Sequence, residues 1–316
     1  MNQAAEARSQ APEVGFSRRL LGPFHITGVF WFKFHHWGIS ILPSWAMGIF
    51  VVLFTTFFFL VLRRIRRAIA SNLEAALGPC SWWQRQVRIY RSMWNFAWCL
   101  TESYEQKTTD RPLTVTVEGD EGLEDLHRDG QGFVLVTAHV GHWEVGALRS
   151  PRYKGWQVHV VREEEMDPKA QEFVLKLYEN RGDDRVKMYF SPHATNVGVT
   201  LLAALRRGEI VALQGDRPPS GGRTVTAELF GRPIELPVGP VSLGRAAEVP
   251  LVPSFVFRAG RSRSRVVFRP PIQVAHTKNR QEDLQEAVQK VVAEVEAAIL
   301  EAPYQWFCFR ELWPGK

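Results

Sequence analysis

Cysteine is scarce in this chain of 316 residues, which contains only Cys80, Cys99 and Cys308. The three are widely spaced and odd in number, so they lack the spacing of a metal site and are consistent with a reducing, cytoplasmic environment. The chain has no G-x-S-x-G motif, which excludes the nucleophile elbow of serine hydrolases. It also has no internal repeat, and no recognition helix, finger or stacking motif, so we expect no nucleic-acid partner.

Charged residues are absent from Ile39–Leu62, a run of 24 residues. A helix of that length, at about 1.5 Å per residue, spans the roughly 30 Å hydrocarbon core of a bilayer. The run lies too far from the start for a cleaved signal peptide, and no A-x-A-like cleavage site follows it. A buried core helix is the alternative, but such helices rarely stay apolar on all sides for so long. The sequence therefore predicts a membrane anchor helix over residues 39–62.

Basic residues follow this run at once, in Arg63–Arg67. By the positive-inside rule they place the downstream part in the cytoplasm. We expect a polar and interfacial segment over 1–38, the anchor over 39–62 and a cytoplasmic domain over 63–316. The aromatic residues before the run fit an interfacial belt, or a segment that lies in the membrane surface without crossing it. The net charge of +6 favours an anionic partner, most simply lipid headgroups.

Apolar strand-like runs alternate with helical stretches over most of the remaining chain. Asn279 and Glu282 form a capping box for the last helix. Alternation of this kind is typical of an α/β fold with a mainly parallel central sheet flanked by helices. Strands are expected at 113–117, 133–137, 158–161, 210–213, 224–230, 251–257 and 265–268, and helices at 65–77, 82–104, 121–128, 167–180, 197–206 and 279–302.

A histidine and a carboxylate follow one of these strands, Phe133–Thr137. They are His139 and Glu144. On a continuous helix, residues five apart point roughly 140° away from each other. They meet if His139 stands at the carboxyl end of the strand, the chain turns at Gly141, and Glu144 lies in the first turn of a following helix. Ligands collect at this edge of α/β sheets, and a histidine held by a carboxylate takes a proton from a hydroxyl.

Two other interpretations of this motif are open. A histidine near a strand end is often a packed, hydrogen-bonded residue. In the second interpretation, His139, His142 and Glu144 are metal ligands. Their spacing is not the two-histidine helix pattern of zinc proteases, and no cysteine cluster accompanies them. We therefore expect no metal.

Polar residues end two further strands on the same expected edge of the sheet. Asp216 and Arg217 follow one, and Arg162 ends the other. With His139 they would form a cationic cleft around a hydroxyl group, and the planar fork of arginine suits phosphate. The alternative for Asp216 and Arg217 is a local salt bridge that closes a turn.

These motifs occur in an order that resembles the lysophospholipid acyltransferase superfamily. Within it, the chain is similar to the lipid A biosynthesis acyltransferases, which add late lauroyl or myristoyl chains. The resemblance covers nearly the whole chain from about Pro43. Besides the apolar anchor, its blocks are Arg66-Arg67 with Asn72-Leu73, Ala138-His-Val-Gly-His-Trp-Glu144, Gly215-Asp-Arg217, Phe230-Gly-Arg-Pro233 with Leu236-Pro-Val-Gly239, Val249-Pro-Leu-Val-Pro253, and Pro303-Tyr-Gln-Trp306 with Arg310.

The resemblance implies a membrane-bound O-acyltransferase at the bacterial inner membrane, with its catalytic domain on the cytoplasmic face. His139 would be the general base and Glu144 the carboxylate that orients it. Arg217, with Asp216 beside it and Arg162 as a weaker candidate, would bind the acceptor, most simply a phosphorylated lipid A precursor. The acyl group would come from the thioester of acyl carrier protein or coenzyme A, without an acyl-enzyme and without a further cofactor.

Two departures from the family pattern leave alternatives open. His142 stands where many relatives have asparagine, and it either tunes His139 or packs. Gly215-Asp-Arg217 replaces the alternating aspartates of several lipid A enzymes, so another glycolipid, an ornithine-type lipid or a lysophospholipid is an alternative acceptor. From other classes, a non-catalytic lipid-binding protein of the same fold and a thioester hydrolase that uses the same pair on water are the rivals.

Overall fold

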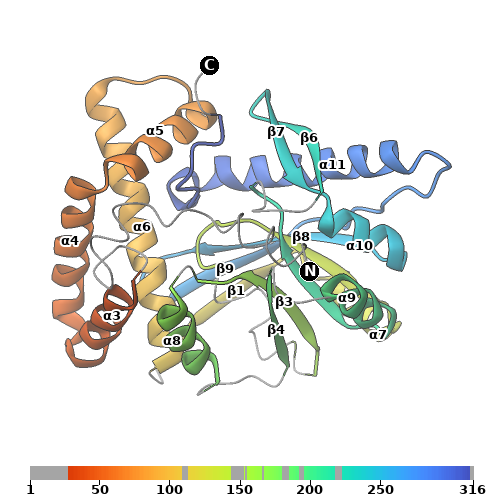
Figure 1. Cartoon of the computed structure of the whole chain (residues 1–316), viewed down its shortest axis with the longest axis horizontal. Helices are drawn as coiled ribbons and strands as arrows, with labels where there is room; N and C mark the ends of the chain where they lie inside the picture. Colours follow the sequence, from red (N-terminus) through yellow and green to blue (C-terminus); the bar gives the residue numbers. More distant parts are fainter. Residues whose placement is uncertain are drawn as a thin grey trace, which may run out of the picture.

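The computed structural model describes residues 28–108, 113–143, 153, 155–165, 167–179, 185–191, 196–217 and 223–313. In this part of the chain a central seven-stranded sheet has helices around it, and a two-stranded hairpin lies beside the last helix (Figure 1). The sheet strands are β1 (Thr114–Glu118), β2 (Phe133–Thr137), β3 (Val158–Glu163), β4 (Val186–Ser191), β5 (Ile210–Gln214), β8 (Leu251–Arg258) and β9 (Arg263–Phe268), and the hairpin is β6 (Thr224–Leu229) with β7 (Arg232–Pro237).

The strand order in the sheet is β1-β9-β8-β2-β5-β3-β4. Every neighbouring pair is parallel except β8 and β9, which are antiparallel. The predicted α/β fold with a mainly parallel sheet is therefore confirmed. Because β2 has β8 on one side and β5 on the other, it lies in the interior of the sheet, where a parallel strand is buried on both faces.

Helices cover the sheet and gather at one end of it. The long helix α11 (Arg280–Glu301) packs on the hairpin and on β8, and α10 (Gly239–Ala247) packs on α9 (Val197–Arg206). The short helix α7 (Leu123–Arg128) contributes Leu123 to the core on one face of the sheet. In Figure 1 the first four helices stand together beside the sheet, with α8 (Pro168–Glu179) below them.

The prediction of one continuous helix over residues 39–62 is wrong, because two of these helices share that range. The chain forms α3 (Val29–Ile41) and α4 (Ser44–Val61), separated by Leu42 and Pro43. Proline disfavours helical backbone in the residue before it, and Leu42 is extended, with φ −76° and ψ 132°. In the described residues no single helix has both the length and the apolar composition to cross a membrane, although α4 and the next helix meet the test together across a bend of 93°.

Two further helices follow, α5 (Arg63–Leu77) and α6 (Trp82–Thr108). They are separated at the predicted turn, where Gly78 has a φ of +75° that favours glycine. The α6 helix packs against α3, α4 and α5, and its Trp98 and Tyr104 join Met47 and Val51 of α4 in one apolar cluster.

Most other predicted elements are found, with ends shifted by a few residues at most. The strand β2 and the helix α9 have the predicted bounds, and Asn279 caps α11 by accepting a hydrogen bond from the Glu282 amide. The strands β4 and β7 and the helix α10 were not predicted.

Candidate active site

The carboxyl ends of β2 and β5 lie side by side in the sheet. Thr137 is paired with Gln214, and the Gly215 amide donates to the Thr137 carbonyl at 2.9 Å. The two chains therefore leave the sheet at the same level, His139 two residues after one strand and Asp216 two residues after the other. The next strand, β3, ends at Glu163 on the same edge.

His139 and Asp216 form a direct pair. The imidazole Nδ1 lies 2.7 Å from Oδ1 of Asp216. The Asp216 side chain is fully buried, whereas the His139 side chain is 12% exposed. An ionised carboxylate accepts only, so Nδ1 carries the hydrogen and Nε2 keeps its lone pair. Among the described residues, Nε2 has no hydrogen-bond partner.

The electrostatics of the pair favour a neutral histidine beside an ionised aspartate. Burial lowers the pKa of His139 below its usual value, although Asp216 and Glu163 act in the opposite direction. Burial alone would raise the pKa of Asp216, but His139 and Arg217 outweigh it and hold that pKa well below its usual range. At neutral pH the imidazole is therefore unprotonated at Nε2 and able to accept a proton.

The turn that carries His139 is braced by a segment from the end of the chain, residues 305–312, which we call the C-terminal strap. The Phe307 amide donates to the His139 carbonyl at 2.8 Å, and the Gly141 amide donates to the Gln305 carbonyl at 2.9 Å. Gly141 has a φ of +57°, and a Cβ there would lie 2.2 Å from the Val256 carbonyl oxygen. Only glycine fits this turn, as the sequence motif required.

The strap is in turn held by Asn72 of α5. The side-chain amide of Asn72 donates to the carbonyls of Cys308 and Arg310 at 3.0 and 2.9 Å, and its oxygen accepts from the Leu312 amide at 3.2 Å. Asn72 is buried, and its bond to the Cys308 carbonyl is buried as well, whereas the bonds to Arg310 and Leu312 are partly buried. The Asn72 block of the sequence therefore belongs to the support of the site.

The structure places the other predicted site residues in different ways. Arg217 follows Asp216, is partly exposed, and makes no hydrogen bond or ion pair with a described residue. Arg162 lies within β3 and pairs with Glu165 at 3.5 Å. Glu144 lies outside the described residues, so its predicted role as the partner of His139 stays a prediction.

His142 does not contact His139 through a ring nitrogen. Its Nδ1 lies 2.6 Å from the Ser264 hydroxyl and its Nε2 lies 2.8 Å from Oε2 of Glu102. Both nitrogens are occupied, so His142 has none left for a metal. In the described part of the chain, no group of three His, Cys, Asp or Glu side chains is arranged to hold a metal ion.

The Asp216 contact is the feature that sequence reasoning missed. The sequence indicated that His139 and Asp216 end strands on the same edge, but not that β2 and β5 are adjacent. The register of that pairing brings the two side chains together. A short strand followed closely by Gly-Asp, as Phe133–Thr137 is followed closely by His139, was the available signal.

Fold and site together define an α/β protein with a histidine–carboxylate pair at the carboxyl edge of its sheet. The sequence matches the family model of bacterial lipid A biosynthesis acyltransferases over residues 14–314, and the chain belongs to this family. Among solved structures it is similar to the 1-acyl-sn-glycerophosphate (LPA) acyltransferase PlsC from Thermotoga maritima, with 12% identity over 79% of this chain and 95% of that chain and a TM-score of 0.35. No curated protein matches the sequence.

Proposed function

We propose that this chain is an enzyme that transfers a fatty acyl group from an acyl thioester to a hydroxyl group of a lipid A precursor. The observation that carries the proposal is the pair of His139 and Asp216, in which Nδ1 of His139 lies 2.7 Å from Oδ1 of Asp216 and Nε2 bonds to none of the described residues. A non-catalytic lipid-binding protein has no use for an imidazole oriented in this way. Membership of the acyltransferase family supports the reaction class.

In this mechanism Nε2 of His139 removes the proton from the acceptor hydroxyl. The oxygen attacks the thioester carbonyl carbon and forms a tetrahedral intermediate. When the C–S bond breaks, the imidazolium returns the proton to the leaving thiolate, so the products are an ester and a free thiol. Asp216, which stays ionised, stabilises the imidazolium and fixes the tautomer. Glu144 was predicted for that role from the sequence, and a part for it beside Asp216 stays a proposal.

The charges around the pair support the choice of acceptor, and the family resemblance supports the choice of donor. The Arg217 guanidinium, which bonds to none of the described residues, lies beside Asp216 and suits a phosphate of the acceptor, and Arg162 on β3 is a second candidate. Acyl carrier protein or coenzyme A would supply the thioester, and the chemistry needs no other cofactor. An ornithine-type lipid or a lysophospholipid is the alternative acceptor.

The same proposal places the enzyme at the cytoplasmic face of a bacterial inner membrane. Apolar side chains are exposed on α3, α4 and the start of α6, and Trp45 and Trp83 are 77% and 73% exposed. Arg63, Arg64 and Arg67 are exposed just after α4, where they suit anionic headgroups. The exposed apolar residues are Trp37, Ile41, Trp45, Ile49, Val52, Leu53, Phe57, Leu60, Val61, Trp82, Trp83 and Val87.

The direct test is an assay of the full chain with acyl carrier protein and coenzyme A thioesters, presented with vesicles that contain a lipid A precursor or a lysophospholipid. Mass spectrometry identifies the acylated product and its chain length. We expect His139→Ala to lower the transfer rate by about 10⁴-fold or more, because the base is removed. His276→Ala, which removes an exposed histidine far along the chain, is the matched control and should have no effect.

The rival functions give different products. A thioester hydrolase would release free fatty acid at the same rate with and without an acceptor. A non-catalytic protein would bind the vesicles and acylate nothing. Full activity of the His139→Ala enzyme would show that the assigned base is wrong.

A further inference from the structure

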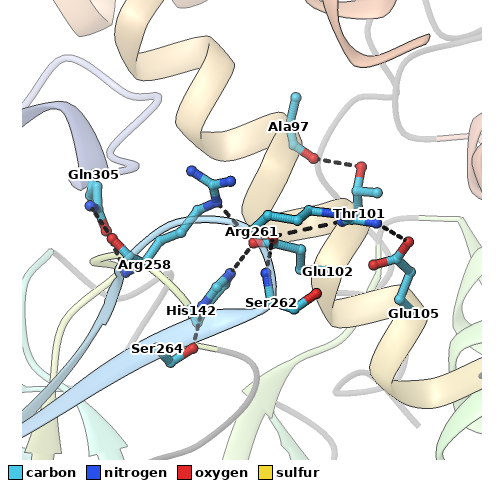
Figure 2. A network of polar contacts seen from close by, with 10 residues as sticks. All are labelled: Ala97, Thr101, Glu102, Glu105, His142, Arg258, Arg261, Ser262, Ser264 and Gln305. Carbon is cyan, nitrogen blue, oxygen red and sulfur yellow. Dashed lines mark hydrogen bonds and ion pairs between the residues drawn. The ribbon is translucent and has the colours of Figure 1, made fainter. Parts of the chain in front are cut away.

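A buried polar network lies between α6 and the turn that carries His139 (Figure 2). Its centre is the Glu102 carboxylate, which is 1% exposed. Oε2 of Glu102 accepts from Nε2 of His142 and from Nε of Arg258, each at 2.8 Å, and Oε1 accepts from the Ser262 amide at 2.8 Å. His142 reaches on to the Ser264 hydroxyl at 2.6 Å.

The contacts define the proton positions in this network. Burial alone would raise the pKa of Glu102, but the bonds from His142, Arg258 and Ser262 outweigh it and lower that pKa. Glu102 is therefore ionised at neutral pH and acts only as an acceptor, so the hydrogen of His142 sits on Nε2. Nδ1 of His142 shares the remaining hydrogen bond with the Ser264 hydroxyl. Both ring nitrogens are committed, and the side chain is fully buried.

The network ends on the backbone next to the proposed base. The His142 amide donates to the Val256 carbonyl at 2.7 Å, so side chain and main chain hold His142 from two directions. Arg258 also connects to the strap through its backbone. Its amide donates to the side-chain oxygen of Gln305 at 2.8 Å, and its carbonyl accepts from the side-chain nitrogen of Gln305 at 3.0 Å. Gln305 is the residue whose carbonyl binds Gly141.

Burying an ionised carboxylate is expensive, and apolar residues of equal volume often stabilise a fold at least as well. A network whose members converge on His142 and Gln305, on either side of the His139 turn, fixes where that turn lies. A base displaced by about 1 Å can lose on the order of 10²-fold in rate.

We propose that Glu102 and His142 are positioning residues, which hold the turn after β2 so that Nε2 of His139 meets the acceptor hydroxyl. Neither side chain touches the substrate, since both are buried and both are fully bonded. The inference rests on the proposed transferase activity.

The test compares two substitutions of one histidine. His142→Gln keeps an amide that donates near the position of Nε2, whereas His142→Leu keeps the bulk and donates nothing. We expect His142→Leu to lower kcat on the order of 10²-fold with little change in KM, and His142→Gln to keep kcat within about tenfold of the parent. The acid limb of kcat/KM against pH should be unchanged in His142→Gln, since His139 is the group that titrates.

A matched control exists elsewhere in the sheet. His159 is also buried, with a hydroxyl and a carboxylate on its two nitrogens, but it lies in β3 away from the His139 turn. His159→Leu should lower the midpoint of urea unfolding to a similar degree as His142→Leu and leave kcat unchanged. Glu102→Gln, which removes only the charge, should behave as His142→Leu does.

The outcomes separate the two proposals. No transfer by the parent enzyme would overturn the proposed function itself. An active parent, with His142→Leu or Glu102→Gln equal to His159→Leu in kcat, would overturn the positioning role alone. If His142→Leu fails to fold, Glu102→Gln and Ser264→Ala decide, because a displaced turn requires kcat to fall in both while KM stays constant, and parental kcat in both would overturn the positioning role.

Discussion

Two histidines of this molecule, His139 and His159, each bond to a carboxylate, but through different ring nitrogens. His159 in β3 has the Tyr189 hydroxyl at 2.9 Å on Nδ1 and the Glu209 carboxylate at 2.7 Å on Nε2. His139 at the carboxyl end of β2 has Asp216 at the same 2.7 Å, but on Nδ1. In His159 both nitrogens are committed, while Nε2 of His139 has no hydrogen-bond partner in the part of the chain that the structure describes.

The difference shows that a histidine beside a carboxylate is not by itself an acid–base site. In His159 the Glu209 carboxylate bonds to Nε2, the ring nitrogen farther from the backbone, so Nε2 is not available to accept a proton. The carboxylate of Asp216 bonds to Nδ1 of His139, so Nε2 points away from Asp216. The edge of the sheet adds to this, because ligands reach the carboxyl ends of parallel strands.

The largest expected effect that tests this contrast comes from Asp216→Asn. The amide would donate to Nδ1 of His139 and place the ring hydrogen on Nε2, so the base is lost. We expect kcat to fall about 10²- to 10⁴-fold. Since Asp216 raises the pKa of His139, its loss should also move the acid limb of the residual kcat/KM to lower pH.

Glu209→Gln is the matched change at the other histidine. It imposes the same tautomer reversal on His159 and should leave kcat and its pH profile at parental values. The contrast would be broken if the two amide variants lost activity equally, or if Asp216→Asn moved the acid limb to higher pH.

A smaller effect is expected from Asn72→Ala, which tests whether the His139 turn depends on the C-terminal strap that Asn72 holds. The change removes the hydrogen bonds that hold Cys308, Arg310 and Leu312, and it leaves the buried Cys308 carbonyl without the Asn72 donor. We expect a loss of about 1–3 kcal/mol in the free energy of unfolding, measured in urea. The strap is expected to loosen and kcat to fall by about tenfold.

Asn95→Ala serves as its control, because among the described residues the side chain of that asparagine bonds to the Arg91 carbonyl of its own helix and to no part of the strap. Its kcat and unfolding midpoint should stay close to the parent. Equal kcat for the two variants would mean that the strap does not support the site.

The smallest effect on activity is expected from His159→Gln, which should change stability alone. Burial lowers the pKa of His159 despite the opposing Glu209. Between that lowered pKa and the value of about 6.5 in the unfolded chain, only the unfolded state binds the proton, so stability falls as pH falls through this window. The variant lacks this dependence.

We therefore expect the unfolding free energy of His159→Gln to be about 1–3 kcal/mol below the parent at pH 7. The gap should narrow toward pH 5, with kcat unchanged throughout. A gap that widened at low pH would mean that His159 is protonated in the folded protein.

The residues that the sequence predicted well are those governed by local rules. Apolar runs specified β2, the capping box at Asn279 started α11, and Gly141 marked the turn after His139. The prediction of one helix over 39–62 counted apolar residues and missed the effect of Pro43 on Leu42.

Long-range pairing explains what the sequence did not predict. The partner of His139 depends on β2 lying next to β5, which no local pattern of either strand encodes. Glu102 sits in a helix of aromatic and apolar residues, 40 positions before His142, and looks there like an ordinary surface acid. Its role is visible only once α6 lies against the β8–β9 end of the sheet.

The C-terminal strap has a consequence for the timing of synthesis. Phe307, which binds the His139 carbonyl, is added 168 positions after His139. At about 5–20 residues per second a ribosome needs roughly 8–34 s to cover that distance. Throughout this interval a nascent chain holds its acid–base residues without the segment that fixes them. Under the proposed function, we expect transfer activity to begin only after the strap has been synthesised and has closed on the His139 turn.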